Sequence, residues 1–255
     1  TLAEGLHNGE TAAVARLRTL HRAITDREEQ GEQLARFLPG GVAEKLIKAG
    51  RQPGETDTLE VTVLMSDIRG YSAIAERTDP SDLAGQLNEH RAAMNRAVLD
   101  NEGTVMQFVG DAVMAVFGAP EPMADHGRRS LASAQAMHLA QEEINARWRG
   151  EGLDSFGLGI GLSTGKVAAA LLGSEERLEY TVVGDTVNLS QRLQQFAEPG
   201  ETVLSEPTAT AIGGPPAGAN RIGPTTVKGR IEPVTAWVWA EPEGAAANQS
   251  PQGSA

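Results

Sequence analysis

Two aspartates that adjoin strand-like segments constrain the fold more than any other feature of this sequence. Asp67 ends the apolar run 61–66, whose length and composition are typical of a buried strand. Asp111 follows Gly110 between the apolar runs 104–109 and 112–117, a pattern that predicts a β-hairpin with Asp111 at its tip. Carboxylates at the end of a strand and at a hairpin tip can converge on one point. Converging carboxylates with few cations nearby favour a hard metal ion such as Mg²⁺ or Mn²⁺.

Taken singly, each aspartate is better explained by a structural role than by metal binding. Asp67 is favoured as a helix cap by about two to one, because caps outnumber metal ligands, and Asp111 is an ordinary turn residue. A third segment, 179–192, makes the pair less ordinary. It carries Asn188 and Arg192, four residues apart and therefore on one face of a predicted helix. An amide beside a guanidinium can hold a ribose and a phosphate, although a solvated helix face would show the same spacing.

The pattern along the chain predicts an α+β fold with a ferredoxin-like split βαβ core and an added β-β-α-β segment, preceded by N-terminal helices. Strands are predicted at 60–66, 104–109, 112–117, 155–163, 166–172, 178–183, 202–204, 221–227 and 234–240. Helices are predicted at 70–78, 81–100 with Ser81 as a candidate cap, 125–148, 186–197 and 206–212. We divide the chain into a helical signalling and linker segment 1–58, a candidate catalytic domain 59–240 and a disordered tail 241–255.

Composition excludes several classes of function. The chain has 255 residues, 40% of them hydrophobic, a net charge of −12 and no cysteine. The acidic balance disfavours nucleic-acid binding and contact with anionic membranes, and the lack of cysteine removes disulfides and thiolate chemistry. No apolar run reaches the length of a membrane span. Because the chain begins at Thr1, we expect a fragment. We expect it in the cytoplasm, alone or as the cytosolic part of a longer, membrane-anchored or multidomain protein.

Three segments in the same order and spacing identify a resemblance. They are Val63-Leu64-Met65-Ser66-Asp67-Ile68-Arg69-Gly70-Tyr71-Ser72, Val109-Gly110-Asp111-Ala112-Val113-Met114-Ala115-Val116-Phe117-Gly118 and Val183-Gly184-Asp185-Thr186-Val187-Asn188-Leu189-Ser190-Gln191-Arg192. Together they resemble the signature blocks of the class III adenylate/guanylate cyclase catalytic domain, bacterial type, over about residues 59–240. Three long motifs in register are far more specific than any one of them.

The resemblance implies a role for each matching residue. Asp67 and Asp111 match the family's metal-binding aspartates, with Ile68 adding its backbone carbonyl, and two Mg²⁺ or Mn²⁺ ions are implied. Asn188 matches the residue that orients the ribose, and Arg192 the residue that stabilises charge on the phosphate under attack. The implied reaction converts a nucleoside triphosphate, by in-line attack of the ribose 3′-oxygen, into a cyclic nucleotide and pyrophosphate for intracellular signalling.

Further residues are expected to bind the substrate. Lys228 resembles the family's late lysine, which contacts the triphosphate, although an ordinary surface lysine would look the same. Backbone N–H groups at the predicted strand-to-helix turn, at Gly70 and Tyr71, favour an anion. At the two base-reading positions the family's adenylate cyclases typically carry Lys and Asp or Thr, and its guanylate cyclases Glu and Cys. This chain carries Gln107 and Thr181 there, which favours ATP, although Gln107 can donate to or accept from either purine.

The resemblance also implies a partner and leaves alternatives open. In the family the metal aspartates and the Asn/Arg/Lys set come from opposite subunits, and this chain carries both sets, so a homodimer with shared sites is expected. The alternatives are a guanylate or mixed-specificity cyclase, a weakly active nucleotide-binding regulatory domain, and a metal-free structural domain. His126, near the predicted start of a helix, is expected to be a helix-start residue and not a ligand.

Overall fold

The computed structural model describes residues 56–174, 177–225 and 233–240. Its elements are β1 (Thr56–Arg69), α3 (Tyr71–Arg77), α4 (Pro80–Asp100), β2 (Thr104–Val109), β3 (Ala112–Phe117), α5 (His126–Glu151), β4 (Gly157–Ser174), β5 (Arg177–Val183), α6 (Asp185–Phe196), β6 (Glu201–Ser205), α7 (Glu206–Ala211), β7 (Asn220–Thr225) and β8 (Val234–Ala240). The predicted N-terminal helices, Lys228 and the predicted tail lie outside the described residues. Among the described helices, none is long and apolar enough to cross a membrane.

One mixed sheet organises the domain, in the order β2-β3-β1-β4-β6-β8-β7, with β5 paired to β4. Strand β3 is antiparallel to both β1 and β2, so β1 and β2 run parallel with β3 between them. This is the split βαβ arrangement, and the α+β prediction is confirmed. Strand β1 pairs with β4 along its whole length, from Thr56 opposite Ala170 to Arg69 opposite Gly157.

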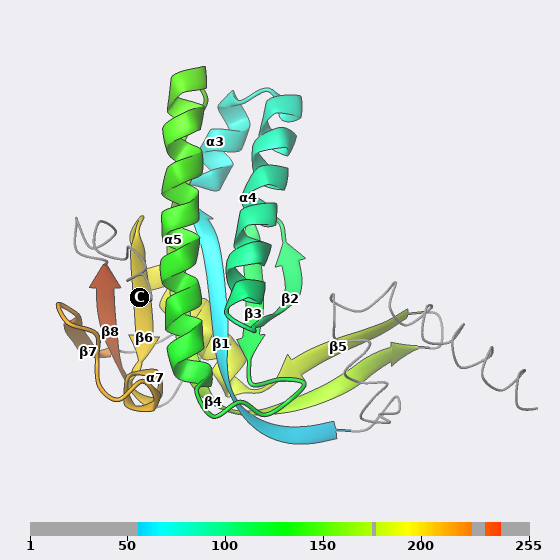
Figure 1. Ribbon diagram of the computed structural model, residues 1–255, viewed down its shortest axis with the longest axis vertical. Coiled ribbons are helices and arrows are strands. Elements are labelled where there is room, and N and C mark those ends of the chain that lie inside the picture. The colour runs from blue at the N-terminus through cyan, green and yellow to red at the C-terminus, as the bar shows by residue number, and fades with distance from the viewer. Residues whose placement is uncertain (1–55, 175–176, 226–232, 241–255) are drawn as a thin grey trace, which may run out of the picture.

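Helices cover both faces of the sheet. In Figure 1, α4 and α5 run side by side across the front of the strands, and the β4–β5 hairpin extends away from the body. Leu204 of β6 packs in the cluster that contains Met94 of α4 and Met137 of α5. Its neighbour Val203 packs instead with Leu193 of α6. Because successive side chains of a strand point to opposite faces, α6 lies on the face opposite α4 and α5.

Three local predictions differ from the structure. Strand β1 begins at Thr56, inside the segment predicted to be a linker. The strands predicted at 155–163 and 166–172 are one continuous strand, β4. The prediction that Ser81 caps α4 was wrong: the cap is Asp79, whose side chain accepts from the Ser81 N–H at 2.8 Å, with Pro80 in the first helical position. An aspartate before Pro competes well for a cap because its carboxylate reaches the free N–H groups of the first turn.

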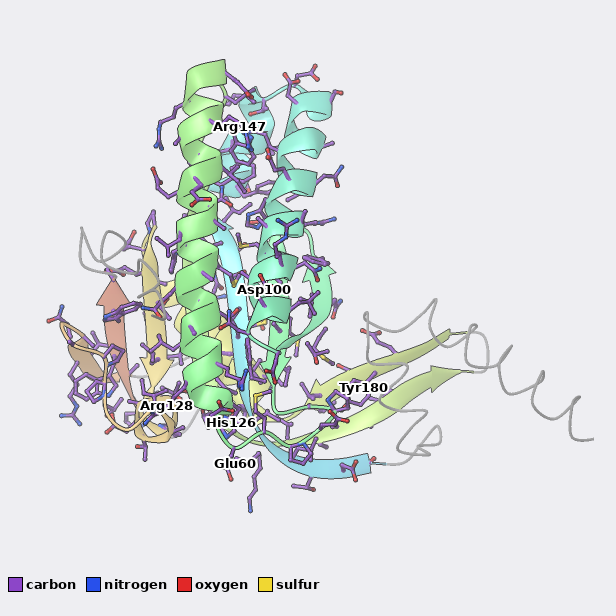
Figure 2. The ribbon with its side chains drawn as sticks, in the orientation of Figure 1. Glu60, Asp100, His126, Arg128, Arg147 and Tyr180 are labelled. Carbon is purple, nitrogen blue, oxygen red and sulfur yellow. The ribbon has the colours of Figure 1, made fainter. Side chains whose placement is uncertain are left out.

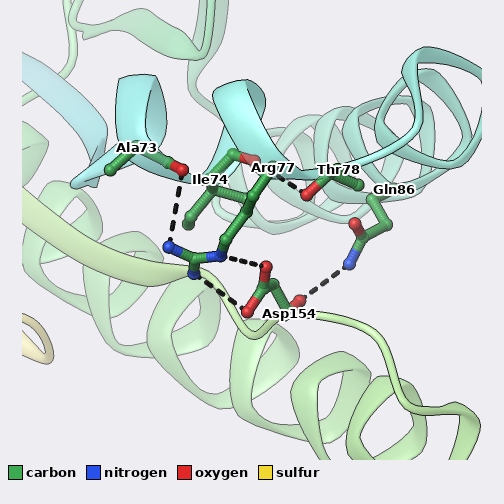
Figure 3. A network of polar contacts seen from close by, with 6 residues as sticks. All are labelled: Ala73, Ile74, Arg77, Thr78, Gln86 and Asp154. Carbon is green, nitrogen blue, oxygen red and sulfur yellow. Dashed lines mark hydrogen bonds and ion pairs between the residues drawn. The ribbon is translucent and has the colours of Figure 1, made fainter.

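Polar contacts fix the short helix α3, which directly follows β1 (Figure 3). The guanidinium of Arg77 donates to both carboxylate oxygens of Asp154, at 2.8 and 2.9 Å, and Gln86 of α4 donates to the Asp154 carbonyl at 2.7 Å. Two parallel N–H···O bonds give this ion pair a defined geometry. The loop before β4 therefore holds α3 and α4 together at the end of the sheet where β1 finishes.

His126 is the first residue of α5, as the sequence predicts. A hydrogen bond of 2.8 Å joins its Nδ1 to the hydroxyl of Thr62, which in turn lies 2.7 Å from the Thr164 hydroxyl. Figure 2 shows His126 at the start of α5 and Glu60 of β1 at the same end of the sheet. This histidine therefore links the start of α5 to the neighbouring central strands β1 and β4.

Candidate active site

Asp67 lies near the end of β1 and does not cap a helix. Strand pairing continues past it, with Asp67 opposite Gly159 of β4. The residue that precedes α3 is Gly70, which adopts a left-handed conformation with φ of 69°. The interpretation of Asp67 as a helix cap is therefore wrong, and its side chain, 37% exposed, is available for another role.

Asp111 occupies the turn between β2 and β3, as the sequence predicts, but it also contacts a third strand. Its Oδ2 accepts a hydrogen bond of 3.1 Å from the backbone N–H of Ile68, the residue after Asp67. Arg91 of α4 donates to the carbonyl of Gly110 in the same turn, and its guanidinium lies 5.4 Å from the centre of the Phe108 ring. The hairpin tip is thus anchored against the end of β1, and the two aspartates are brought together.

The carboxylate of Asp67 lies close enough to raise the pKa of Asp111. The pKa of Asp111 is raised to about 6, first because the group is partly withdrawn from water, and second because of the hydrogen bond and the negative charge of Asp67. Two facing carboxylates are a natural place for a divalent cation, which relieves their repulsion. No group of three or more His, Cys, Asp or Glu residues gathers among the described residues. One or two carboxylates completed by substrate phosphates are what Mg²⁺ commonly uses, so these residues fit a hard divalent ion.

Two donors that the sequence did not reveal hold Asp67. Arg69 donates to Asp67 Oδ2 from Nη2 at 3.3 Å, and Gln194 of α6 donates to the same oxygen from Nε2 at 3.2 Å. Arg69 is a near neighbour in sequence and lies within a motif that was recognised. Gln194 is 127 positions away, and nothing in local sequence pattern connects it to Asp67.

Asn188 and Arg192 lie on α6, as the sequence predicts, and share one of its faces. Asn188 is exposed and Arg192 is half-buried. Within the described part of the chain, the Arg192 Nη1 is buried and has no hydrogen-bond partner. No described hydrogen bond or ion pair joins either side chain to Asp67 or Asp111. One chain therefore presents two separate polar sets, the carboxylates at the end of β1 and the amide and guanidinium of α6.

The other predicted substrate residues are dispersed. Gln107 is exposed on β2, at an irregularity in its pairing with β3, and Thr181 is half-buried on β5 opposite Ala170. Gly70 is exposed, and the Tyr71 ring packs edge-on against Phe156, with ring centres 6.3 Å apart. The strands β2 and β5 are separated by β3, β1 and β4 in the sheet. A single chain therefore does not bring Gln107 and Thr181 together.

This fold, with its two separate polar sets, is that of a nucleotide cyclase catalytic domain. The family model of the adenylate and guanylate cyclase catalytic domain matches residues 55–240, and the chain belongs to this family. Its members are lyases that form cyclic nucleotides.

Relatives of both nucleotide specificities resemble the chain. Adenylate cyclase 1 of Rhizobium meliloti (strain 1021) is 30% identical over 200 residues, which cover 78% of this chain and 30% of that protein. The chain thus spans less than a third of the length of this relative. The solved guanylyl cyclase Cya2 is 32% identical with a TM-score of 0.67, over 76% of this chain and 98% of that one. The adenylyl cyclase CyaB from P. aeruginosa is 30% identical with a TM-score of 0.68, over 72% and 95%.

A nucleotide complex is known among these relatives. The guanylate cyclase domain of RhGC from Catenaria anguillulae, solved in complex with GTP, is 29% identical with a TM-score of 0.64, over 72% of this chain and 98% of that one.

Proposed function

We propose that this chain is an adenylate cyclase that converts ATP to 3′,5′-cyclic AMP and pyrophosphate. The observation that carries the proposal is the convergence of Asp67 and Asp111, joined through the Ile68 N–H, in a chain that also presents Asn188 and Arg192 on one helix face. Purified protein incubated with Mn²⁺ and ATP should yield cyclic AMP and pyrophosphate in equal amounts. A protein that binds ATP without turnover would instead be a regulatory nucleotide-binding domain.

The metal half of the site consists of Asp67, Asp111 and the backbone carbonyl of Ile68, which would hold two Mg²⁺ or Mn²⁺ ions. When bound, such ions lower the pKa of the attacking hydroxyl and neutralise charge on the phosphates. The proposed reaction needs no nucleophilic side chain, because the ribose supplies the attacking oxygen. The job of the carboxylates is to place charge and to orient the triphosphate.

The helical half of the site acts on the ribose and the α-phosphate. The 3′-oxygen forms a bond to the α-phosphorus, the bond from that phosphorus to the β-phosphate oxygen breaks, and the hydroxyl proton passes to solvent. Asn188 would orient the ribose for in-line attack, and Arg192 would stabilise the charge that develops on the phosphoryl oxygens. The Arg192 Nη1 is buried and has no partner among the described residues, which supports this role, because a guanidinium N–H withdrawn from water needs an acceptor. Lys228 would contact the triphosphate, with the turn at Gly70 and Tyr71 beside it.

The two halves would meet only in a dimer. In a twofold homodimer, Asp67 and Asp111 of one chain would face Asn188 and Arg192 of the other, which gives two equivalent shared sites. The separation of the two sets within the described chain supports this arrangement. Mixing an Asp67→Ala chain with an Arg192→Ala chain should then restore one intact site per mixed dimer. Two folded mutants that stay inactive when mixed would argue against shared sites.

The most detailed part of the proposal is the preference for ATP over GTP. Thr181 is a variant that adenylate-specific sites accept, and the glutamate expected of a guanylate-specific site is replaced by Gln107. We therefore expect faster conversion of ATP than of GTP with Mn²⁺, measured side by side by chromatography of the cyclic products. The alternative is a guanylate or mixed-specificity enzyme, which the similarity to guanylyl cyclase Cya2 and the two-way hydrogen bonding of Gln107 favour. Equal or reversed rates would select it.

A further inference from the structure

Gln194 is a buried amide that contacts a metal-site carboxylate from another element. Its side chain belongs to a residue only 4% exposed, and its Nε2 donates to Asp67 Oδ2 at 3.2 Å. Arg69 donates to the same oxygen at 3.3 Å. Two donors on one oxygen restrict the rotation of the carboxylate about its χ2 bond. Partners that orient a metal ligand in this way usually tune metal affinity by a factor of ten or more.

The helix that carries Gln194 is held unusually close to the sheet. A Cβ on Gly161 of β4 would lie 2.2 Å from the Ser190 carbonyl oxygen and 2.3 Å from the Gln194 nitrogen. A Cβ on Gly159, the strand partner of Asp67, would lie 3.0 Å from the Ala197 carbonyl oxygen. The helix backbone therefore rests directly on the strand, and Gln194 has little freedom to move relative to Asp67.

The same helix presents the other half-site on a different side. Gln194 follows Arg192 by two positions, which turns its side chain by about 200° around the helix axis. The buried face of α6 thus holds Asp67, while Asn188 and Arg192 project from another face. Any shift of α6 that moves Arg192 also moves the donor that orients Asp67.

We propose that Gln194 is a positioning residue: it holds the Asp67 carboxylate, a proposed metal ligand, in a fixed position relative to α6. It thereby couples the two active sites of the dimer. This inference rests on the proposed function. Asp67 would serve one active site, whereas Asn188 and Arg192 of the same chain would serve the other. The Gln194–Asp67 hydrogen bond is then a direct link from the metal half of one site to the phosphate-binding half of its twin.

Metal binding alone gives the first test. Mn²⁺ is titrated into the full chain without nucleotide, and free Mn²⁺ is followed by electron paramagnetic resonance. Gln194→Met removes the donor at similar volume and should weaken binding about tenfold. Gln195→Met, at the neighbouring exposed position, is the matched control and should bind as the wild type does. If Gln194→Met and wild type bind Mn²⁺ within twofold of each other, with matching melting temperatures, the proposal is wrong.

Mixed dimers give the second test. In a mixture of Arg192→Ala and Asp67→Ala chains, the Arg192→Ala chain supplies Asp67 to the single intact site. Gln194→Met in that chain should raise the Mn²⁺ concentration for half-maximal rate about tenfold, with a smaller change in kcat at saturating Mn²⁺. In the Asp67→Ala chain the acceptor is already gone, so the same substitution should not change the Mn²⁺ concentration for half-maximal rate. Equal shifts from both chains would mean general destabilisation of α6 and would overturn the proposal.

These outcomes are separable from failure of the proposed function. A wild-type protein that forms no cyclic nucleotide with Mn²⁺ would refute the cyclase assignment. A wild-type protein that forms it, together with an unchanged Mn²⁺ dependence in the Gln194→Met protein, would refute only the role of Gln194.

Discussion

Asp111 is held where its negative charge opposes folding, and the same charge is proposed to bind a metal ion. Its pKa is raised to about 6, by partial burial and by the carboxylate of Asp67. Against a usual value of 3.8, the ionisation penalty in the folded state is absent below pH 4 and complete above pH 6. The metal-free protein should therefore lose stability as the pH rises between these values, through this group alone.

Asp111→Asn tests this balance between stability and function. Asn keeps an oxygen for the Ile68 N–H but removes the charge. At pH 7.5 in EDTA, we expect a melting temperature about 2–4 °C above wild type, which corresponds to roughly 1 kcal/mol after solvent screening of a half-buried group. Cyclase activity should fall at least about 100-fold, because a neutral amide binds a divalent ion poorly. A melting temperature below wild type at pH 7.5, as well as at pH 4, would show that the carboxylate stabilises the apo fold.

His90 should give the protein a second pH dependence of opposite sign. The ring is fully buried in α4, its Nδ1 lies 2.6 Å from Gln141 Oε1 of α5, and its Nε2 has no partner among the described residues. Burial lowers the pKa of His90 below its usual 6.5, and the nearby Arg91 lowers it further, against a rise from the Gln141 hydrogen bond. Because the unfolded chain takes up the proton more readily, the stability from this group is complete above pH 6.5 and is lost as the pH falls.

The measurement for His90 is urea unfolding between pH 5 and pH 7.5. Wild type should lose up to about 1.4 kcal/mol per pH unit through this one group as the pH falls. His90→Asn should be less stable at pH 7.5, because the ring leaves a cavity, but its unfolding free energy should depend less steeply on pH. The same slope in both proteins would show that another group carries the acid sensitivity.

At the scale of elements, the sequence pattern was least reliable in predicting strand ends at glycines. The strands predicted at 155–163 and 166–172 leave a gap that contains Gly165, yet β4 runs through it. The glycine is there because a Cβ would lie 2.7 Å from the Thr186 hydroxyl oxygen of α6. Apolar periodicity found almost every helix and strand because it reports burial. It could not distinguish a glycine that ends a strand from one that lets a helix pack closely against the strand, because that difference depends on a neighbour distant in sequence.

The close packing of α6 against Gly161 of β4 leads to a prediction about stability. Gly161→Ala should destabilise the domain by about 3 kcal/mol, because the new methyl group meets two backbone atoms that cannot rotate away. Gly85→Ala is the matched control: it lies in α4, where the added methyl carbon would have no atom within 4 Å, and it should add up to about 1 kcal/mol of stability. Urea unfolding of both variants measures the difference. Equal effects would show that α6 can move off β4 at little cost.

At the scale of the whole molecule, the sequence predicted where the elements carrying the candidate site residues lie better than it predicted the contacts among those residues. The aspartates were predicted from strand and turn patterns, and the structure brings them together. Gln194, which donates to Asp67, and Arg91, which anchors the hairpin tip, were missed, because each contact joins elements that only the tertiary fold brings together. Gln107 and Thr181, which are proposed to read the base, lie on strands that three other strands separate in the sheet of one chain. A linear motif cannot reveal this separation, and under the proposal only a second chain could bring the two residues together.

The dimer itself leads to a prediction about concentration. If one chain supplies the carboxylates and the other supplies Arg192, a monomer holds two incomplete sites and its rate is negligible. Well below the dissociation constant, the dimer concentration varies with the square of the chain concentration, so the total rate should rise with slope two on logarithmic axes. Well above it, nearly all chains are paired and the slope should fall to one.

Initial rates with saturating Mn²⁺ and ATP, measured over several decades of protein concentration, would locate this change of slope. Sedimentation velocity under the same conditions should place the monomer–dimer midpoint at the same concentration. The Asp67→Ala and Arg192→Ala chains provide the control, because their mixture should show the same midpoint with at most about a quarter of the wild-type rate: half the dimers are mixed, and each has one intact site of two. A slope of one throughout, from a protein that sediments as a monomer, would mean that a single chain completes its own site. In that case α6 would have to rotate to turn Arg192 toward Asp67, against the close contact of its backbone with Gly161.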